Sequence, residues 1–230
     1  MSNHVDTGWK SVAEAGGSPS TPLPAPIAMR VRRATKQFTD KPIPQEVLDE
    51  LIELTTTSPS SFNLQDWRIV VVKSPEQRRA LAAAAYGQSQ VVTAPVTFVF
   101  AADTKAWSPE HLAPIFDEAR RRGAWPDKVI DYYGNAIGAG QQALGEKQRE
   151  YAVKDAMLAA AHLMIAASSL GIDSSPMNGW VEAEVKKVIG AGDNPDIVIA
   201  CLVSVGYGAG GFGNPGRLGV GQTVFIDRLG

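Results

Sequence analysis

Four cationic side chains stand close together in the first part of the chain: Arg30, Arg32, Arg33 and Lys36. The guanidinium group of arginine is a planar fork that matches phosphate oxygens, and lysine adds a point charge. Arg32 and Lys36 are four residues apart, so on a helical turn they would share one face. The cluster indicates a site for a phosphate or another anionic group. Taken alone, it also fits a solvated basic face near a chain terminus.

Two other segments carry hydrogen-bonding groups at close spacing. Ser58–Trp67 offers hydroxyls and amides that can donate and accept along the edge of a heterocycle, although Ser, Pro and Asn are also ordinary turn residues. Gly171–Trp180 contains Asn178-Gly179, where a backbone amide can approach a ligand closely because glycine has no side chain. The alternative for this second segment is a plain loop between two helices.

Other catalytic signatures are missing from the sequence. Gly206–Gly211 is rich in glycine, but no helix is expected after it, so it lacks the context of a dinucleotide fingerprint. We find no P-loop, no Gly-x-Ser-x-Gly elbow and no His-Glu-x-x-His motif. The three histidines have no ligand spacing, and Cys201 stands alone in an apolar run. We therefore expect no metal site, no side-chain catalytic triad and a buried structural role for Cys201.

Composition is that of one globular domain of 230 residues, 44% hydrophobic and 20% charged. The net charge of -2 gives no general attraction to nucleic acid or to an anionic membrane. The N-terminus has no apolar leader, and the longest apolar stretch is shorter than the ~20 residues that span a bilayer. We expect a cytoplasmic protein with no nucleic-acid or membrane partner.

Hydrophobic periodicity predicts helices separated by few strands. Without a regular βαβ alternation, this order favours an α+β layer fold. A long helix, apolar nearly all round, must be buried on every side and suggests a central helix at a subunit interface. We expect a flexible arm over 1–27 and one domain over 28–230. The predicted helices follow Pro44 to Ser58, then cover 75–86, two segments within 103–148, 149–170 and 181–189, and the strands cover 69–72, 96–101, 197–205 and 223–226.

Three segments, weak signals singly, indicate one protein family when they occur together and in this order: Arg32–Phe38, Ser58–Trp67 and Gly171–Trp180, followed by Arg217. From about residue 28 to its end the chain resembles the FMN-dependent nitroreductase family. The resemblance implies an α+β fold with a central, mixed but mostly antiparallel sheet flanked by helices. It also implies a domain-swapped homodimer that exchanges C-terminal segments and holds two FMN molecules at its interface.

The resemblance further implies which residues hold FMN. Carried over by position, they are Arg32, Arg33, Ala34, Lys36 and Arg217 at the phosphate, ribityl chain and pyrimidine edge; Ser60, Ser61 and Asn63 from the second subunit; Gln88 and Gln90 at the ribityl or pyrimidine side; and Pro176, Met177, Asn178 and Gly179 over one face of the ring.

Four positions depart from the family pattern. Ala34 stands where Ser is frequent, Asp66 where Pro is usual, Asn178 where Glu is common and Pro215 where a basic residue is common. Asp66 places a carboxylate near the flavin loop, and Asn178 removes a charge that could steer acceptors. These changes bear on acceptor choice more than on FMN binding.

The implied activity is a two-step exchange in which the flavin carries the chemistry. NADH or NADPH stacks on the exposed flavin face, gives hydride and leaves, and a nitroarene or quinone then takes its place. Tyr132, Tyr133 and Trp107 would line the acceptor channel, or serve ordinary packing. The alternatives are a flavin-dependent reductase or dehalogenase of a specific metabolite, and a non-catalytic flavin-holding protein.

Overall fold

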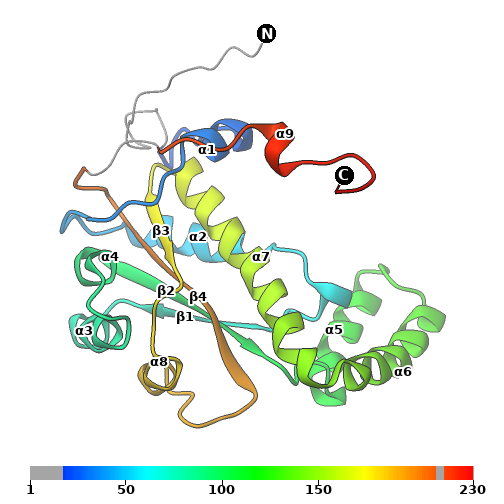
Figure 1. Cartoon of the computed structure of the whole chain (residues 1–230). Coiled ribbons are helices and arrows are strands. Elements are labelled where there is room, and N and C mark those ends of the chain that lie inside the picture. Colours follow the sequence, from blue (N-terminus) through cyan, green and yellow to red (C-terminus); the bar gives the residue numbers. More distant parts are fainter. Residues whose placement is uncertain (1–17, 211–214, 230) are drawn as a thin grey trace.

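The computed structural model describes residues 18–210 and 215–229, which form helices around one sheet (Figure 1). The sheet has the order β1-β2-β4-β3 and every pairing in it is antiparallel. Its strands are β1 (Trp67–Val72), β2 (Val96–Asp103), β3 (Asp173–Met177) and β4 (Ile197–Gly206). The predicted α+β class with a mostly antiparallel central sheet flanked by helices is confirmed, although the described sheet has no parallel pairing among its strands and so is not mixed. Most of the predicted N-terminal arm, residues 1–17, lies outside the described residues.

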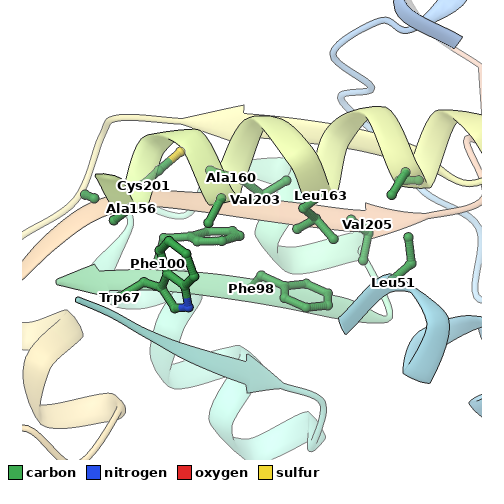
Figure 2. Packing of buried hydrophobic residues seen from close by; sticks show 14 of the residues in the cluster. Leu51, Trp67, Phe98, Phe100, Ala156, Ala160, Leu163, Cys201, Val203 and Val205 are labelled. Atoms are coloured by element: carbon green, nitrogen blue, oxygen red, sulfur yellow. The ribbon is translucent and has the colours of Figure 1, made fainter. Parts of the chain in front are cut away.

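One face of the sheet is covered by the long helix α7 (Gln148–Ser169). Its small residues Ala156 and Ala160 let the helix lie close to the sheet, where Leu163 and Phe100 are fully buried (Figure 2). Each large apolar side chain buried in this way contributes about 1.5–3 kcal/mol to folding. Cys201 belongs to the same core, and burial raises the pKa of its thiol to about 11.

Helix α2 (Gln45–Thr56) packs beside α7 through Val47, Leu48 and Leu51. It begins directly after Pro44, as the sequence predicts. The opposite face of the sheet is covered by α3 (Pro75–Ala84), α4 (Ser89–Thr93) and α8 (Glu182–Val188). Ser74 caps α3 by accepting a hydrogen bond from the Gln77 amide at 3.3 Å.

Two helices, α5 (Pro109–Arg121) and α6 (Asp127–Leu144), lie beside the N-terminal end of α7 (Figure 1). They follow β2 and lead into α7 through the 3-10 turn η2 (Gly145–Lys147). They share a small core with Leu64, which lies just after the 3-10 turn η1 (Ser61–Asn63). The prediction of two helices within 103–148 is confirmed.

The basic cluster does not form the helical turn on which Arg32 and Lys36 would share a face. Helix α1 (Ala25–Val31) ends just before Arg32, whose φ of -54° and ψ of 132° leave the helix. Arg32 and Lys36 therefore do not share a helical face. The segment runs extended instead, and Ala34 forms a parallel bridge with Ser174 on β3.

Two strand assignments also differ from expectation. The first half of Gly171–Trp180 is the edge strand β3, where a loop was expected, because β4 offers a free edge with which Asp173–Met177 can pair. The strand predicted at 223–226 is wrong: α9 (Val220–Thr223) covers its start, and the described tail pairs with no strand. A β-branched run forms a strand only where a partner edge exists. None of the described helices is long and apolar enough to cross a membrane.

Candidate functional site

Three arginines meet at the end of α1, although they are far apart in the sequence. Arg32 and Arg33 leave α1, and Arg217 in the tail lies close enough for its charge to act on both. The Arg32 Nη1 and Arg33 Nε atoms are buried and have no hydrogen-bond partner. Burial, followed by the charge of Arg217, lowers the pKa of both guanidinium groups. Like charges with buried, unpaired donors fit an anionic ligand, because leaving such groups unpaired is costly.

The segment after these arginines is held by β3 and α4. The Thr35 backbone amide donates to the backbone oxygen of Ser174 at 3.1 Å, and the Ser89 hydroxyl donates to the backbone oxygen of Lys36 at 2.9 Å. The backbone of Lys36 is thereby fixed, while its side chain makes no ion pair within the described residues. Ala34 and Lys36 thus lie in the segment that follows Arg32 and Arg33 and runs beside β3 and α4.

Gln88, Gln90 and Gly179 are joined by hydrogen bonds. Gln88 Nε2 donates to the Gly179 oxygen at 2.6 Å, and Gln90 Nε2 donates to Gln88 Oε1 at 3.1 Å. Pro176 and Met177 end β3, and the exposed Asn178 follows them. The structure therefore gathers one set of predicted site residues around the β3 edge of the sheet. We call this set the basic half-site: Arg32, Arg33, Ala34, Lys36, Gln88, Gln90, Pro176, Met177, Asn178, Gly179 and Arg217.

Sequence reasoning did not single out three hydroxyls in this region. Thr35, Ser174 and Ser175 are buried, and their side-chain oxygens have no hydrogen-bond partner. Thr35 and Ser174 are also bonded to one another through the backbone. These residues lie within two of the segments that carry the family resemblance, Arg32–Phe38 and Gly171–Trp180, so the sequence did point to them. Only the pairing of the first segment with β3 brings them together.

Three predicted site residues lie away from the basic half-site in space: Ser60, Ser61 and Asn63. Ser61 is bonded to Asp155 near the start of α7, whereas the Ser168 hydroxyl near the end of α7 donates to the Ala28 oxygen in α1. Thirteen residues of helix separate these two anchors, about 20 Å at 1.5 Å per residue. Within one chain, these three residues do not meet the basic half-site.

The predicted channel residues lie around the loop that contains Asn63. The Tyr133 ring makes edge contacts with Phe62 at 5.4 Å and Trp125 at 5.3 Å, and the exposed Tyr132 lies 5.8 Å from Tyr133. Trp107 instead donates from Nε1 to the Thr104 oxygen at 2.9 Å and packs against the small core below. A cavity of about 840 Å³ opens between this loop and α5, and its lining includes Asn63, Gln65, Trp67, His111 and Trp125.

Asp66 and Asp155 form a buried acidic pair beneath the same loop. Burial first, and then the charge of Asp155, raise the pKa of Asp66 to about 8, against smaller opposing effects that include a backbone hydrogen bond and Arg68. Burial also raises the pKa of Asp155, while the hydrogen bonds from Ser61 oppose that rise. Two carboxylates in one buried region cannot both ionise cheaply, so Asp66 holds its proton near neutral pH.

Comparison with known proteins places these residues in a family. Residues 29–207 match the model of the Nitroreductase family. An NADH dehydrogenase of Thermus thermophilus is 32% identical over 188 residues, which cover 81% of this chain and 88% of that protein. A Bacillus subtilis protein named as an NAD(P)H nitroreductase is 31% identical over 184 residues, which cover 79% and 87%.

Solved structures show the same fold. An Exiguobacterium sibiricum protein described as a nitroreductase, solved in complex with FMN, superimposes with a TM-score of 0.80 at 26% identity, covering 89% of this chain and 98% of that one. A nitroreductase family protein of Streptococcus pneumoniae gives a TM-score of 0.74 at 28% identity, covering 86% and 98%.

Proposed function

This chain belongs to the nitroreductase family, and on that premise we propose that it is an FMN-dependent oxidoreductase that carries electrons from NADH or NADPH to nitroaromatic or quinone-type acceptors. The observation that carries the proposal is the cluster of Arg32, Arg33 and Arg217, in which Arg32 Nη1 and Arg33 Nε are buried and have no hydrogen-bond partner. A phosphate group would satisfy these donors through charge-assisted hydrogen bonds. The FMN bound to the Exiguobacterium sibiricum relative supports this choice of ligand.

In this proposal, the chain binds, orients and shields the cofactor, and bound FMN supplies the hydride and electron transfer. The three arginines would hold the phosphate, and Lys36, Gln88 and Gln90 would bind the ribityl chain and the pyrimidine edge. Cationic and amide donors at that edge stabilise negative charge there without reorganisation. Residues 176–179 would cover one face of the ring, so that the other face would stay open to a nicotinamide or an acceptor.

We further propose that the active form is a homodimer in which each subunit completes the site of the other. Ser60, Ser61 and Asn63 are too far from the basic half-site to serve the same cofactor from one chain, so a second copy would supply them. An uncovered apolar stripe on α7 supports this arrangement: Leu158 is 44% exposed, and Ala161 and Ile165 on the same face are half-buried.

The tail supports exchange between subunits. Its apolar side chains stand in solvent in the single chain, and Ile226 is 81% exposed. Leu218, Val220, Val224, Phe225 and Leu229 are exposed as well. Monomeric proteins seldom expose so many large apolar residues together. Packing this tail against a second copy would bury them.

The acceptor would enter beside the aromatic residues of the partner's loop. Phe62, Tyr132 and Tyr133 present ring faces and edges that suit a planar, electron-poor molecule, and Trp107 supports them from below. Because the nicotinamide and the acceptor would use the same open face in turn, we expect ping-pong kinetics.

The test is an absorbance spectrum of the purified full chain, loaded with FMN and titrated with NADPH without oxygen. The proposal expects a yellow protein that bleaches and regains its colour when a nitroarene or quinone is added. Bleaching without recovery by either acceptor would indicate a reductase or dehalogenase of another metabolite. A yellow protein that NADH and NADPH both fail to bleach would be a flavin-holding protein. A chain that takes up no FMN would refute the cofactor assignment.

A further inference from the structure

The loop from Ser60 to Gln65 has an unusual backbone. Three residues of the loop have a positive φ: Phe62 at 51°, Asn63 at 57° and Gln65 at 49°. Residues other than glycine seldom adopt this left-handed backbone conformation. Each such residue costs of order 1–3 kcal/mol unless its surroundings impose the conformation. The side chains of Phe62, Asn63 and Gln65 are exposed, and Phe62 makes an edge contact with Tyr133. The buried groups that bond the loop lie beneath it.

Asp155 binds the loop from beneath at Ser61, and His111 contacts it at Leu64, whose backbone oxygen lies 2.6 Å from His111 Nε2. Asp155 is 4% exposed, and its two carboxylate oxygens accept separate hydrogen bonds from Ser61, the backbone amide at 2.9 Å and the hydroxyl at 3.2 Å. Hydrogen bonds to an ionised acceptor are stronger than neutral ones. The loop is closed further by the Gln65 amide, which donates to the Ser60 hydroxyl oxygen at 2.9 Å.

A second buried carboxyl group lies next to this anchor. Asp66 is 2% exposed, follows the loop directly, and its Oδ1 atom has no hydrogen-bond partner. The titratable groups that act on it are Asp155 from α7, Arg68 from β1 and Asp103 at the end of β2, and Tyr151 of α7 lines the same narrow space. Two of these neighbours are acidic, so an ionised Asp66 would be poorly compensated.

We propose that Asp155 is the positioning residue of the Ser60–Gln65 loop: its ionised carboxylate, with a neutral Asp66 beside it, fixes Ser60, Ser61 and Asn63 in the geometry that meets the partner subunit's cofactor. The part of this inference that concerns the cofactor rests on the proposed function. The part that concerns the loop rests on the Ser61 contacts and on the left-handed backbone. It assigns a role to the departure at Asp66, which sequence reasoning could not explain.

The proposal makes the site sensitive to alkaline pH. The pKa of Asp66 is raised to about 8, so above that pH a second negative charge appears close to Asp155. Repulsion between the two carboxylates then weakens the hold of Asp155 on Ser61 and releases the strained backbone. Below that pH the proton on Asp66 removes the repulsion.

The test follows hydrogen exchange in the flavin-free full chain and FMN affinity in the same samples, at pH 7 and pH 9. The variants are Asp155→Ala, Asp155→Asn and Asp66→Asn. The control is Glu150→Gln, at an exposed residue of α7 that forms an ion pair with Lys154. Asp155→Asn keeps one acceptor oxygen for the Ser61 amide and so serves as the conservative variant, also where the alanine variant does not fold.

At pH 7, Asp155→Ala is expected to lower exchange protection of the amides in residues 60–65 by about tenfold or more, with Asp155→Asn intermediate and Glu150→Gln unchanged. The wild-type loop is expected to lose protection between pH 7 and pH 9, and Asp66→Asn to keep it. FMN affinity should follow loop protection in every sample. Unchanged protection in Asp155→Asn or Asp155→Ala would overturn the proposal, as would an increase spread evenly over α7 and the sheet. A wild-type chain that binds no FMN would refute the proposed function, while the exchange data would still decide the role of Asp155.

Discussion

The side-chain amide of Gln88 donates a hydrogen bond to the backbone oxygen of Gly179, and a Cβ atom at position 179 would lie 3.1 Å from that same nitrogen. This contact is tighter than ordinary van der Waals packing, so Gly179→Ala should push the Gln88 side chain out of place. We expect FMN affinity, measured by quenching of flavin fluorescence, to fall by about three- to tenfold, with a change in stability below ~1 kcal/mol.

Gly138→Ala is the matched control for this substitution. Gly138 lies inside α6, and a Cβ atom there would meet nothing within 4 Å. Alanine in a helix interior is better than glycine by roughly 0.5–1 kcal/mol, so this variant should be slightly more stable and should bind FMN as the wild type does. Equal FMN affinities for both variants would contradict the assignment of the Gln88–Gly179 pair to the site.

Arg217→Ala tests whether the arginine cluster binds an anion. A hydrogen bond to a charged group contributes about 1.5–3 kcal/mol, so its loss should weaken FMN binding by about ten- to a hundredfold. The flavin-free protein should not lose stability, because the substitution removes repulsion from Arg32 and Arg33. Isothermal titration with FMN and thermal unfolding without it measure the two effects. The exposed tail residue Arg228 provides the control, Arg228→Ala, and equal losses in both variants would refute a specific role for Arg217.

Asp66→Asn should change how stability depends on pH. The pKa of Asp66 rises from 3.8 in the unfolded chain to about 8 in the fold, so between these values the folded state holds a proton that the unfolded state has released. The stability from this group is fully present below about pH 4 and is lost as the pH rises through 8, by at most ~1.4 kcal/mol per pH unit. The asparagine variant lacks this loss.

Urea denaturation at pH 5, 7 and 9 measures the difference between the two proteins. The free energy of unfolding of Asp66→Asn should rise relative to that of the wild type from pH 5 to about pH 8 and then level off. Two curves that run parallel across this range would show that Asp66 titrates normally in the folded protein.

Leu158→Lys tests the proposed interface on α7. A lysine in an apolar interface would bury an unpaired charge, whereas at the solvent-exposed face of a monomer it would be harmless. We expect a shift from dimer to monomer in size-exclusion chromatography with light scattering, together with weaker FMN binding. Arg79→Gln, at an exposed position of α3 on the opposite face of the sheet, should leave the dimer intact. A Leu158→Lys variant with unchanged mass and FMN affinity would place the interface elsewhere.

Local sequence signals were enough to predict several helix ends and the two central strands. Pro44 and Ser74-Pro75 mark helix starts, and Gly171, with a φ of 77°, lies directly after the last turn of α7. These signals act within a few residues, so they need no knowledge of the rest of the chain. The apolar runs at Val96 and Ile197 likewise announced the two central strands, since strands buried on both faces are apolar throughout.

Long-range pairing decided the remainder. Asp173–Met177 has no strand signature and becomes β3 because β4 presents an open edge, while the β-branched run near Val224 finds no such edge in the described chain. The same holds for the site. By itself, the sequence determined which residue types were available to hold a phosphate and a ring; only the tertiary structure brought Arg217 to Arg32 and set Asp155 beneath Ser61. Both contacts join residues far apart along the chain, and no local preference encodes a distance that packing alone creates.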